Sequence, residues 1–247
     1  MPSSVWDDYK KIFHDLLPNV CKKLDPGRLY WPSSPGHSLA PPESDQIYGS
    51  GDNHYWGVWH GGDGFDAFEE NIGRFLSEYG MQSFPEMGTI MKFAEEEDLD
   101  INSKVMKERQ KASLGTGNLV KYIEDYFPPQ KDFQAIVVLS QVMQAFAIKK
   151  AVETHRRSMP FCMGTLYWQF NDCWPAISWS SVDYFGNWKA LHYHAKRFFN
   201  EIIIVVHEEG EHIHISVVND QHRTVQSRVK FQLSTFNGSI IHEKKID

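Results

Sequence analysis

The sequence predicts an α/β fold: half of a (β/α)₈ barrel, followed by the first strands of a β-sandwich. Residues 1–200 alternate strand and helix signals four times, which is typical of a parallel sheet covered by helices. Four such units make up half of an eightfold barrel. Beyond residue 200 the helical signals stop, and alternating β-branched runs separated by turn residues predict antiparallel strands over 201–247.

Composition narrows the class of protein. The chain has 247 residues, of which 41% are hydrophobic and 23% charged, as in a globular protein of one or two domains. A net charge of −7 gives no support for nucleic acid or an anionic membrane as partner. No signal-peptide core opens the sequence, and no uninterrupted apolar run reaches the roughly 20 residues that span a bilayer. The three cysteines lack metal-type spacing, so reduced thiols are expected.

In the N-terminal region the sequence predicts one long helix and two strands. Apolar residues recur at helical spacing over residues 5–24, from Trp6 to Val20. An Asp-Pro-Gly turn ends this helix, and a short aromatic strand is expected at 28–31. Residues 33–50 read as a loop, and the second strand covers 52–56.

The middle of the chain predicts the remaining units of the barrel half. The third strand ends at Glu78, and Ser83 is expected to cap the following helix, with Pro85 in its first turn. The fourth strand covers 163–168. Helices are expected at 65–72, 84–94, 104–113, 118–126, 132–157 and 188–199, and later strands at 202–206, 212–218 and 225–233. In the longest helix, the apolar stripe is expected to contain Ile136, Leu139, Met143, Phe146 and Ala147.

Polar and aromatic residues gather where strands end. Glu78 lies at a strand-to-loop boundary, the end at which barrel enzymes place catalytic groups; the alternative is a solvated loop glutamate. Trp168, Asn171 and Asp172 follow the fourth strand. An aromatic face beside amide and carboxylate groups suits a sugar site. Trp179 and Trp188 are instead expected in the core.

Four stretches carry a resemblance to a known family: 30–35, 51–60, 75–86 and the tryptophan-rich 164–190. Together they resemble the β-mannosidases of glycoside hydrolase family 2 over nearly the whole chain. The resemblance implies a retaining glycosidase whose barrel strands five to eight lie in residues 1–200, with an immunoglobulin-like sandwich starting in 201–247. It implies Glu78 as nucleophile, with His54, Tyr55 and Trp56 lining the sugar subsite and Trp168, Asn171 and Asp172 closing it. No cofactor is implied.

One departure from the family pattern is informative. The family's acid/base glutamate follows an asparagine at the end of the fourth strand, which would precede the helix at 5–24. No Asn-Glu pair ends an apolar run here; Asn200-Glu201 comes at the end of a helix. The chain is therefore interpreted as a C-terminal fragment that is nearly inactive alone.

The expected partners are a β-mannoside oligosaccharide or glycoprotein glycan, the missing N-terminal half of the barrel, and further copies of the fragment. The compartment of the parent stays open between cytoplasm, periplasm and lysosome.

Two other functions stay open. The fragment could come from a β-galactosidase or β-glucuronidase, which also use a glutamate on the seventh strand. It could also be a non-catalytic half-barrel that binds sugar or assembles. His212 and His214 share a face of a predicted strand, but no third ligand stands at useful spacing, so no metal is predicted.

Overall fold

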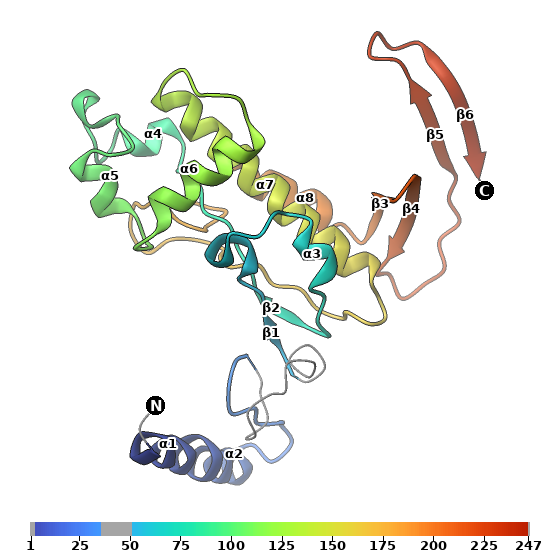
Figure 1. Cartoon of the computed structure of the whole chain (residues 1–247). Helices are drawn as coiled ribbons and strands as arrows, with labels where there is room; N and C mark the ends of the chain where they lie inside the picture. Colours follow the sequence, from blue (N-terminus) through green and yellow to red (C-terminus); the bar gives the residue numbers. More distant parts are fainter. Residues whose placement is uncertain (1–2, 36–50, 247) are drawn as a thin grey trace.

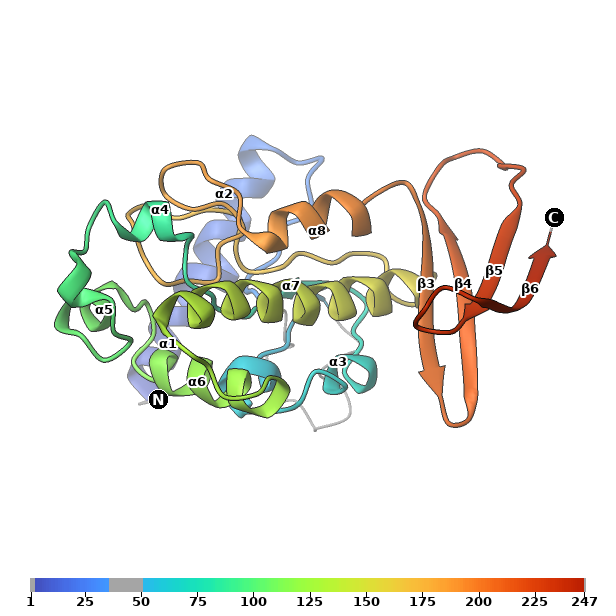
Figure 2. The same ribbon diagram turned by 90° about the horizontal axis from the view of Figure 1, so that it is seen from above.

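The computed structural model describes residues 3–35 and 51–246, and it shows a mixed helix and strand fold organised around one long helix. This helix, α7 (Phe133–Arg157), runs through the middle of the molecule (Figure 1). Two further helices, α6 (Gly115–Tyr126) and α8 (Ala190–Phe198), flank it on opposite sides (Figure 2). α7 therefore forms the centre of the hydrophobic core.

The predicted N-terminal helix is confirmed as a continuous run of α1 (Ser3–Lys10), a π-helical turn η1 (Lys11–Leu16) and α2 (Leu17–Leu24). It stands apart from the main body in Figure 1. Its apolar stripe stays uncovered by the described residues, with Leu16 58% exposed.

The strand predicted at 28–31 is wrong. These residues form no strand, and the Tyr30 hydroxyl instead donates to the Phe13 carbonyl at 2.9 Å. Of the predicted loop, residues 36–50 lie outside the part of the chain that is described.

The other three strands predicted before residue 200 are shorter than expected, and the one predicted at 163–168 is reduced to a bridge at Thr165, but all three segments run in parallel. β1 (Asn53–His54) pairs in parallel with β2 (Leu76–Glu78), with His54 opposite Glu78. Residues 163–168 then run parallel to β2, where the Leu76 amide donates to the Gly164 carbonyl at 2.9 Å. The carboxyl ends of three adjacent segments therefore point the same way.

Short helices connect these segments: η3 (Gly57–Gly61), α3 (Ala67–Glu70), α4 (Met87–Ile90), η4 (Glu96–Asp98) and α5 (Lys104–Arg109). The predicted cap at Ser83 is wrong, because Ser83 is in an extended bridge to Ser178 and its hydroxyl donates to Gln144 Oε1 at 2.8 Å. The N-cap position of α4 is Glu86, so this helix is much shorter than expected.

The buried face of α7 is rotated relative to the predicted stripe. Met143 and Ala147 are buried as expected, whereas Phe146 is 56% exposed. Two buried polar residues, Ser140 and Gln144, join the inner face because they bond the chain that follows β2. By length and composition α7 is apolar enough to cross a membrane, but half of its most apolar window is buried inside the fold, as in a core helix.

The C-terminal region is antiparallel, as predicted. β3 (Ile202–Glu209) pairs with β4 (His212–Asn219), and β5 (Val229–Ser234) pairs with β6 (Ile240–Ile246). Ile203, Val205 and Val218 form a small second core beside the end of α7. Both hairpins lie beyond this end of α7 in Figure 2. A domain boundary near residue 200 remains a prediction.

Candidate active site

The site is built where β1, β2 and the 163–168 segment end together. The Tyr55 amide donates to the Glu78 carbonyl at 2.9 Å, and the Trp168 amide donates to the Tyr79 carbonyl at 2.8 Å. These backbone bonds bring Glu78, Trp56 and Trp168 to the same edge of the parallel segments.

The Glu78 carboxylate lies between two nitrogen atoms from β1 and the turn that follows it. Trp56 Nε1 donates to Glu78 Oε2 at 3.3 Å, and His54 Nδ1 lies 3.3 Å from the same oxygen. The Glu78 side chain is 28% exposed, so it is partly shielded and still accessible.

A polar chain continues behind His54. Ser34 Oγ lies 3.0 Å from His54 Nε2 and donates to Asp52 Oδ2 at 2.5 Å. Because Ser34 gives its single proton to Asp52, it accepts a hydrogen from Nε2. The His54 ring thus lies between Ser34 on one side and Glu78 on the other. Asp52 therefore orients the imidazole that faces Glu78.

Gly80 allows the aromatic wall to approach the site closely. A Cβ at this position would lie 2.4 Å from the Trp168 carbonyl oxygen and close to the rings of Trp179 and Trp56. Trp56 and Trp179 meet edge to face at 6.2 Å between centroids, and Trp168 remains 43% exposed. An exposed indole beside a carboxylate is suited to stacking on a sugar ring.

Other predicted residues lie differently. The Tyr55 ring is buried against Phe68, and its hydroxyl donates to Asp63 at 2.8 Å, so this side chain points into the core and away from Glu78. Asn171 is exposed. Trp188, predicted as core, is 42% exposed, and that prediction is wrong; its ring packs on His192 and Tyr193.

The Asp172 carboxylate is buried and already engaged. Its Oδ2 accepts hydrogen bonds from Ser178 at 2.7 Å and Ser180 at 2.6 Å, and its Oδ1 accepts one from Gln169 at 3.1 Å. Asp172 thus fixes the loop that follows Trp168.

Sequence reasoning missed two buried ionisable groups beneath the site. His155 on α7 lies 2.8 Å from Thr165 Oγ1, which is also 2.6 Å from the Tyr79 hydroxyl. Burial lowers the pKa of His155 to about 4 and raises that of Tyr79. His155 and Tyr79 are therefore both neutral, and their contacts with Thr165 hold the floor of the site together.

Lys189 is the second missed group. Its Nζ is buried and donates to the Ser83 and Ser178 carbonyls, each at 3.2 Å. Burial lowers the pKa of Lys189 to about 8, and nearby Asp172 and Asp183 oppose that shift in part. A buried lysine directly after an aromatic looks like a surface residue in the sequence, so no local signal identifies it.

Comparison with known proteins identifies relatives of this chain. No family model matches the chain. The chain is 36% identical over 206 residues to β-mannosidase B of Aspergillus fumigatus and 37% identical over 203 residues to that of Aspergillus flavus. A solved β-D-mannosidase from Dictyoglomus thermophilum superposes over 96% of this chain with a TM-score of 0.79 and 32% identity. The chain is related to the β-mannosidases.

The relationship to the β-mannosidases covers 80% of this chain in the Aspergillus proteins but only 24% of their length, and 29% of the Dictyoglomus chain. The chain thus spans about a quarter of the curated β-mannosidases that it matches. An Amycolatopsis orientalis exo-chitosanase shares the fold over 81% of this chain and 24% of its own, with a TM-score of 0.61 at 17% identity. The resemblance to β-mannosidases indicated by the motifs is confirmed.

Proposed function

We propose that this chain is the C-terminal half of the catalytic barrel of a retaining β-mannosidase, with strands five to eight in residues 1–200 and a sandwich beginning at 201. The substrate is a terminal β-linked mannose at the non-reducing end of an oligosaccharide or glycoprotein glycan. One observation carries the proposal: in a chain related to β-mannosidases, Glu78 stands at the end of a parallel strand between two nitrogen groups.

Glu78 is the nucleophile in this proposal. Its carboxylate attacks the anomeric carbon, the glycosidic bond breaks, and a covalent glycosyl-enzyme forms that water then hydrolyses. Trp56 Nε1 donates to Glu78 Oε2 and His54 Nδ1 lies against the same oxygen, so the carboxylate is held in one position, which supports the role. Trp168 supplies the stacking surface and Asn171 a polar contact at its rim. Asp172 contributes by holding the loop between them.

The second carboxyl of a retaining enzyme lies about 5–5.5 Å from the nucleophile. We assign it to chain outside these 247 residues, together with barrel strands one to four. The described residues leave the apolar stripe of α1–α2 uncovered, and Trp6, Leu16 and Val20 are each at least 36% exposed. Such a stripe suits a contact with another element, which supports this assignment. Expressed alone, the chain is expected to self-associate through such surfaces, which size-exclusion chromatography will reveal.

The experiment is to label Glu78. A 2-deoxy-2-fluoro-β-mannosyl fluoride needs no proton for its leaving group and slows turnover of the glycosyl-enzyme. It is applied to the parent protein read from the complete coding frame and to this chain. Peptide mass mapping is expected to place the adduct on Glu78, and Glu78→Gln is expected to abolish labelling and lower turnover at least about 10³-fold.

Glu86→Gln is the matched control, because Glu86 is an exposed glutamate eight residues further along. Labelling at another carboxylate, or equal labelling of the Glu78→Gln variant, would contradict the proposal. The same preparation distinguishes the sugar: faster hydrolysis of aryl β-galactoside than of aryl β-mannoside by the parent would favour the β-galactosidase alternative. Absence of any glycoside turnover would favour the binding half-barrel.

A further inference from the structure

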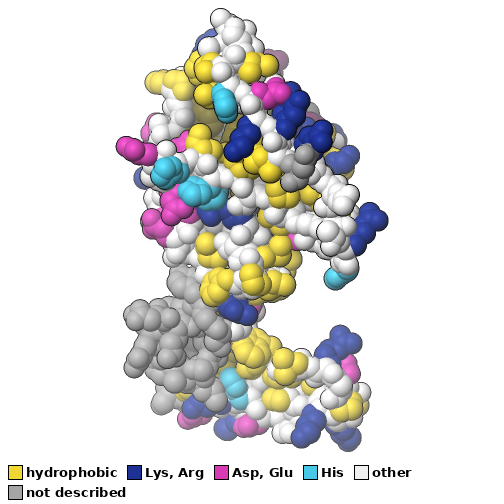
Figure 3. All heavy atoms as spheres, turned by 90° about the vertical axis from the view of Figure 1, so that its right-hand side faces the viewer, with side chains coloured by type: hydrophobic (Ala, Val, Ile, Leu, Met, Phe, Trp, Pro, Cys, Tyr) yellow, Lys and Arg dark blue, Asp and Glu magenta, His cyan; other side chains and the backbone are white. Residues whose placement is uncertain are grey.

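The first hairpin of the C-terminal region brings four metal-ligating side chains to one face. In β3 and β4, His207 stands opposite His214 and Glu209 stands opposite His212. Residues two apart on a strand share a face, so these two cross-strand pairs lie side by side next to the hairpin turn. Figure 3 shows histidine side chains gathered beside acidic ones on this side of the molecule.

The geometry of three of these groups is close to that of a metal site. Ligand atoms of His207, Glu209 and His214 all lie within 4.8 Å of one another, and His214 Nε2 is 3.5 Å from Glu209 Oε2. Bonds of about 2.0–2.2 Å in a tetrahedral zinc site separate neighbouring ligand atoms by about 3.3–3.5 Å. Glu209 and His214 already stand at that spacing, and a small closure of His207 completes it.

The side chains are free to make this closure. The side chains of Glu209 and His214 are 77% and 47% exposed, so rotation of either meets little resistance. The His207 and His214 rings lie 5.2 Å apart between centroids. A turn of these rings directs two nitrogen lone pairs to a shared point.

His207 supplies an independent observation. Its Nδ1 is buried, and no hydrogen-bond partner for it is found among the described residues, which is uncommon for a buried polar atom. Imidazole is the commonest metal ligand among protein side chains, and this unpartnered nitrogen is available to bind an ion.

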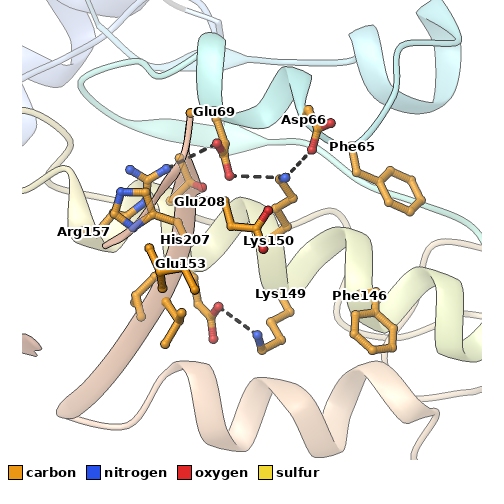
Figure 4. Close-up of a pocket in the computed structure, with 15 residues that line it drawn as sticks. Phe65, Asp66, Glu69, Phe146, Lys149, Lys150, Glu153, Arg157, His207 and Glu208 are labelled. Carbon is orange, nitrogen blue, oxygen red and sulfur yellow. Dashed lines mark hydrogen bonds and ion pairs between the residues drawn. The ribbon is translucent and has the colours of Figure 1, made fainter. Parts of the chain in front are cut away.

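The charges around the site are nearly balanced. His207 lies beside Arg157, which pairs with Glu69 at 3.7 Å, and Lys150 contacts the same glutamate at 3.2 Å (Figure 4). Glu69 thus offsets part of the positive charge on this side of His207. On the other side Glu209 carries the negative charge that a divalent cation needs.

We propose that His207, Glu209 and His214 form a site for a divalent transition-metal cation of the Zn²⁺ class, with water in the fourth position and His212 at its rim. Two imidazoles and one carboxylate are a donor set that zinc accepts, whereas calcium and magnesium prefer oxygen donors alone. The site lies on the β3–β4 hairpin and goes beyond the proposed glycosidase activity.

The test is calorimetric titration of the metal-stripped 247-residue chain with zinc chloride at pH 7.5. We expect one equivalent to bind. His214→Ala and Glu209→Gln are each expected to weaken binding at least about 10-fold, since loss of a group that only hydrogen-bonds to a metal ligand already costs about 10–100-fold in affinity. His222→Ala is the matched control, because His222 is exposed and lies outside the hairpin, and it is expected to bind as the unmodified chain does.

Two further measurements keep the outcome decisive. Cobalt chloride is expected to give the intense visible absorption of four-coordinate cobalt with the unmodified chain and not with Glu209→Gln, a substitution at an exposed position that leaves the hairpin folded. Binding is expected to weaken in acid, because protons compete with the metal for the imidazole nitrogens. Several weak equivalents, or equal affinity in the His214→Ala and His222→Ala variants, would overturn the site.

Discussion

Gly80 offers a sharp structural test, because the aromatic wall of the site closes directly on its backbone. A methyl group added there would lie 2.4 Å from the Trp168 carbonyl oxygen, 3.0 Å from Trp179 Cδ1 and 3.1 Å from the outer ring carbon of Trp56. Normal carbon contacts are about 3.5–4.0 Å. The Trp168 backbone is fixed by its amide bond to the Tyr79 carbonyl at 2.8 Å, so relief requires the segment to shift by about 1 Å.

The expected result of Gly80→Ala is a loss of about 1–3 kcal/mol in the free energy of unfolding, the range for overpacking in a well-packed interior. For a chain of this size, each kcal/mol corresponds to about 2–4 °C in Tm. The assay is urea unfolding followed by tryptophan fluorescence, to which the indoles of Trp56 and Trp179 beside Gly80 contribute. In the parent enzyme the same shift is expected to raise KM, because Trp168 moves.

Gly117→Ala is the matched control. Gly117 lies in α6, is exposed, and has no heavy atom within 4 Å of where a Cβ would stand. The same substitution there is expected to stabilise the fold by about 0.5–1 kcal/mol, because alanine loses less conformational freedom in a helix. If the free energy of unfolding of Gly80→Ala lies within about 0.5 kcal/mol of that of the unmodified chain, the close approach of Trp168 to Gly80 is refuted.

Three further predictions follow from buried groups and from the assigned chemistry. Lys189 has a pKa of about 8 in the folded chain and 10.5 in the unfolded chain. Between these two pH values the unfolded chain binds more protons, so the free energy of unfolding rises with pH. Relative to Lys189→Met, urea unfolding should show a gain of about 3 kcal/mol from pH 8 to 10.5. A flat difference would contradict a buried lysine. His155 has a folded pKa of about 4 against 6.5, so stability is lost as pH falls from 6.5 to 4, and His155→Gln should be less sensitive to acid by up to about 3 kcal/mol. Equal acid sensitivity would argue for an exposed histidine. Without the general acid, this chain should hydrolyse methyl β-mannoside about 10²–10⁴-fold more slowly than its parent does. The difference in rate should be smaller for dinitrophenyl β-mannoside, whose leaving group needs no proton. An equal difference in initial rates for both substrates would refute the missing-acid explanation.

The order of the elements could be predicted from the sequence, because it depends on local periodicity. The long helix α7, the parallel sense of β1 and β2, and the antiparallel C-terminal strands all follow from such patterns. The prediction of a strand at 28–31 was wrong, because aromatic residues favour a strand whether or not a neighbouring strand is present to pair with it. Propensity does not report whether that partner exists.

The candidate site was predictable in part, and the error at Tyr55 shows where the reasoning stopped. His54, Tyr55 and Trp56 are consecutive, and consecutive side chains of an extended strand point to opposite faces. The structure follows this rule, since His54 and Trp56 reach Glu78 while Tyr55 enters the core. Lys189 and His155 differ, because their burial comes from segments far apart in the chain.

The register of the β3–β4 hairpin can be predicted from the sequence. Gly210 and Glu211 separate two β runs, and a two-residue turn with glycine at a positive φ, here 60°, fixes the pairing that flanks it. Glu209 must then face His212, and counting one pair further along the same face sets His207 opposite His214. The third ligand that appeared to be missing beside His212 and His214 therefore comes from the neighbouring strand. Spacing along one strand does not reveal this ligand, because it belongs to the paired strand of the ladder.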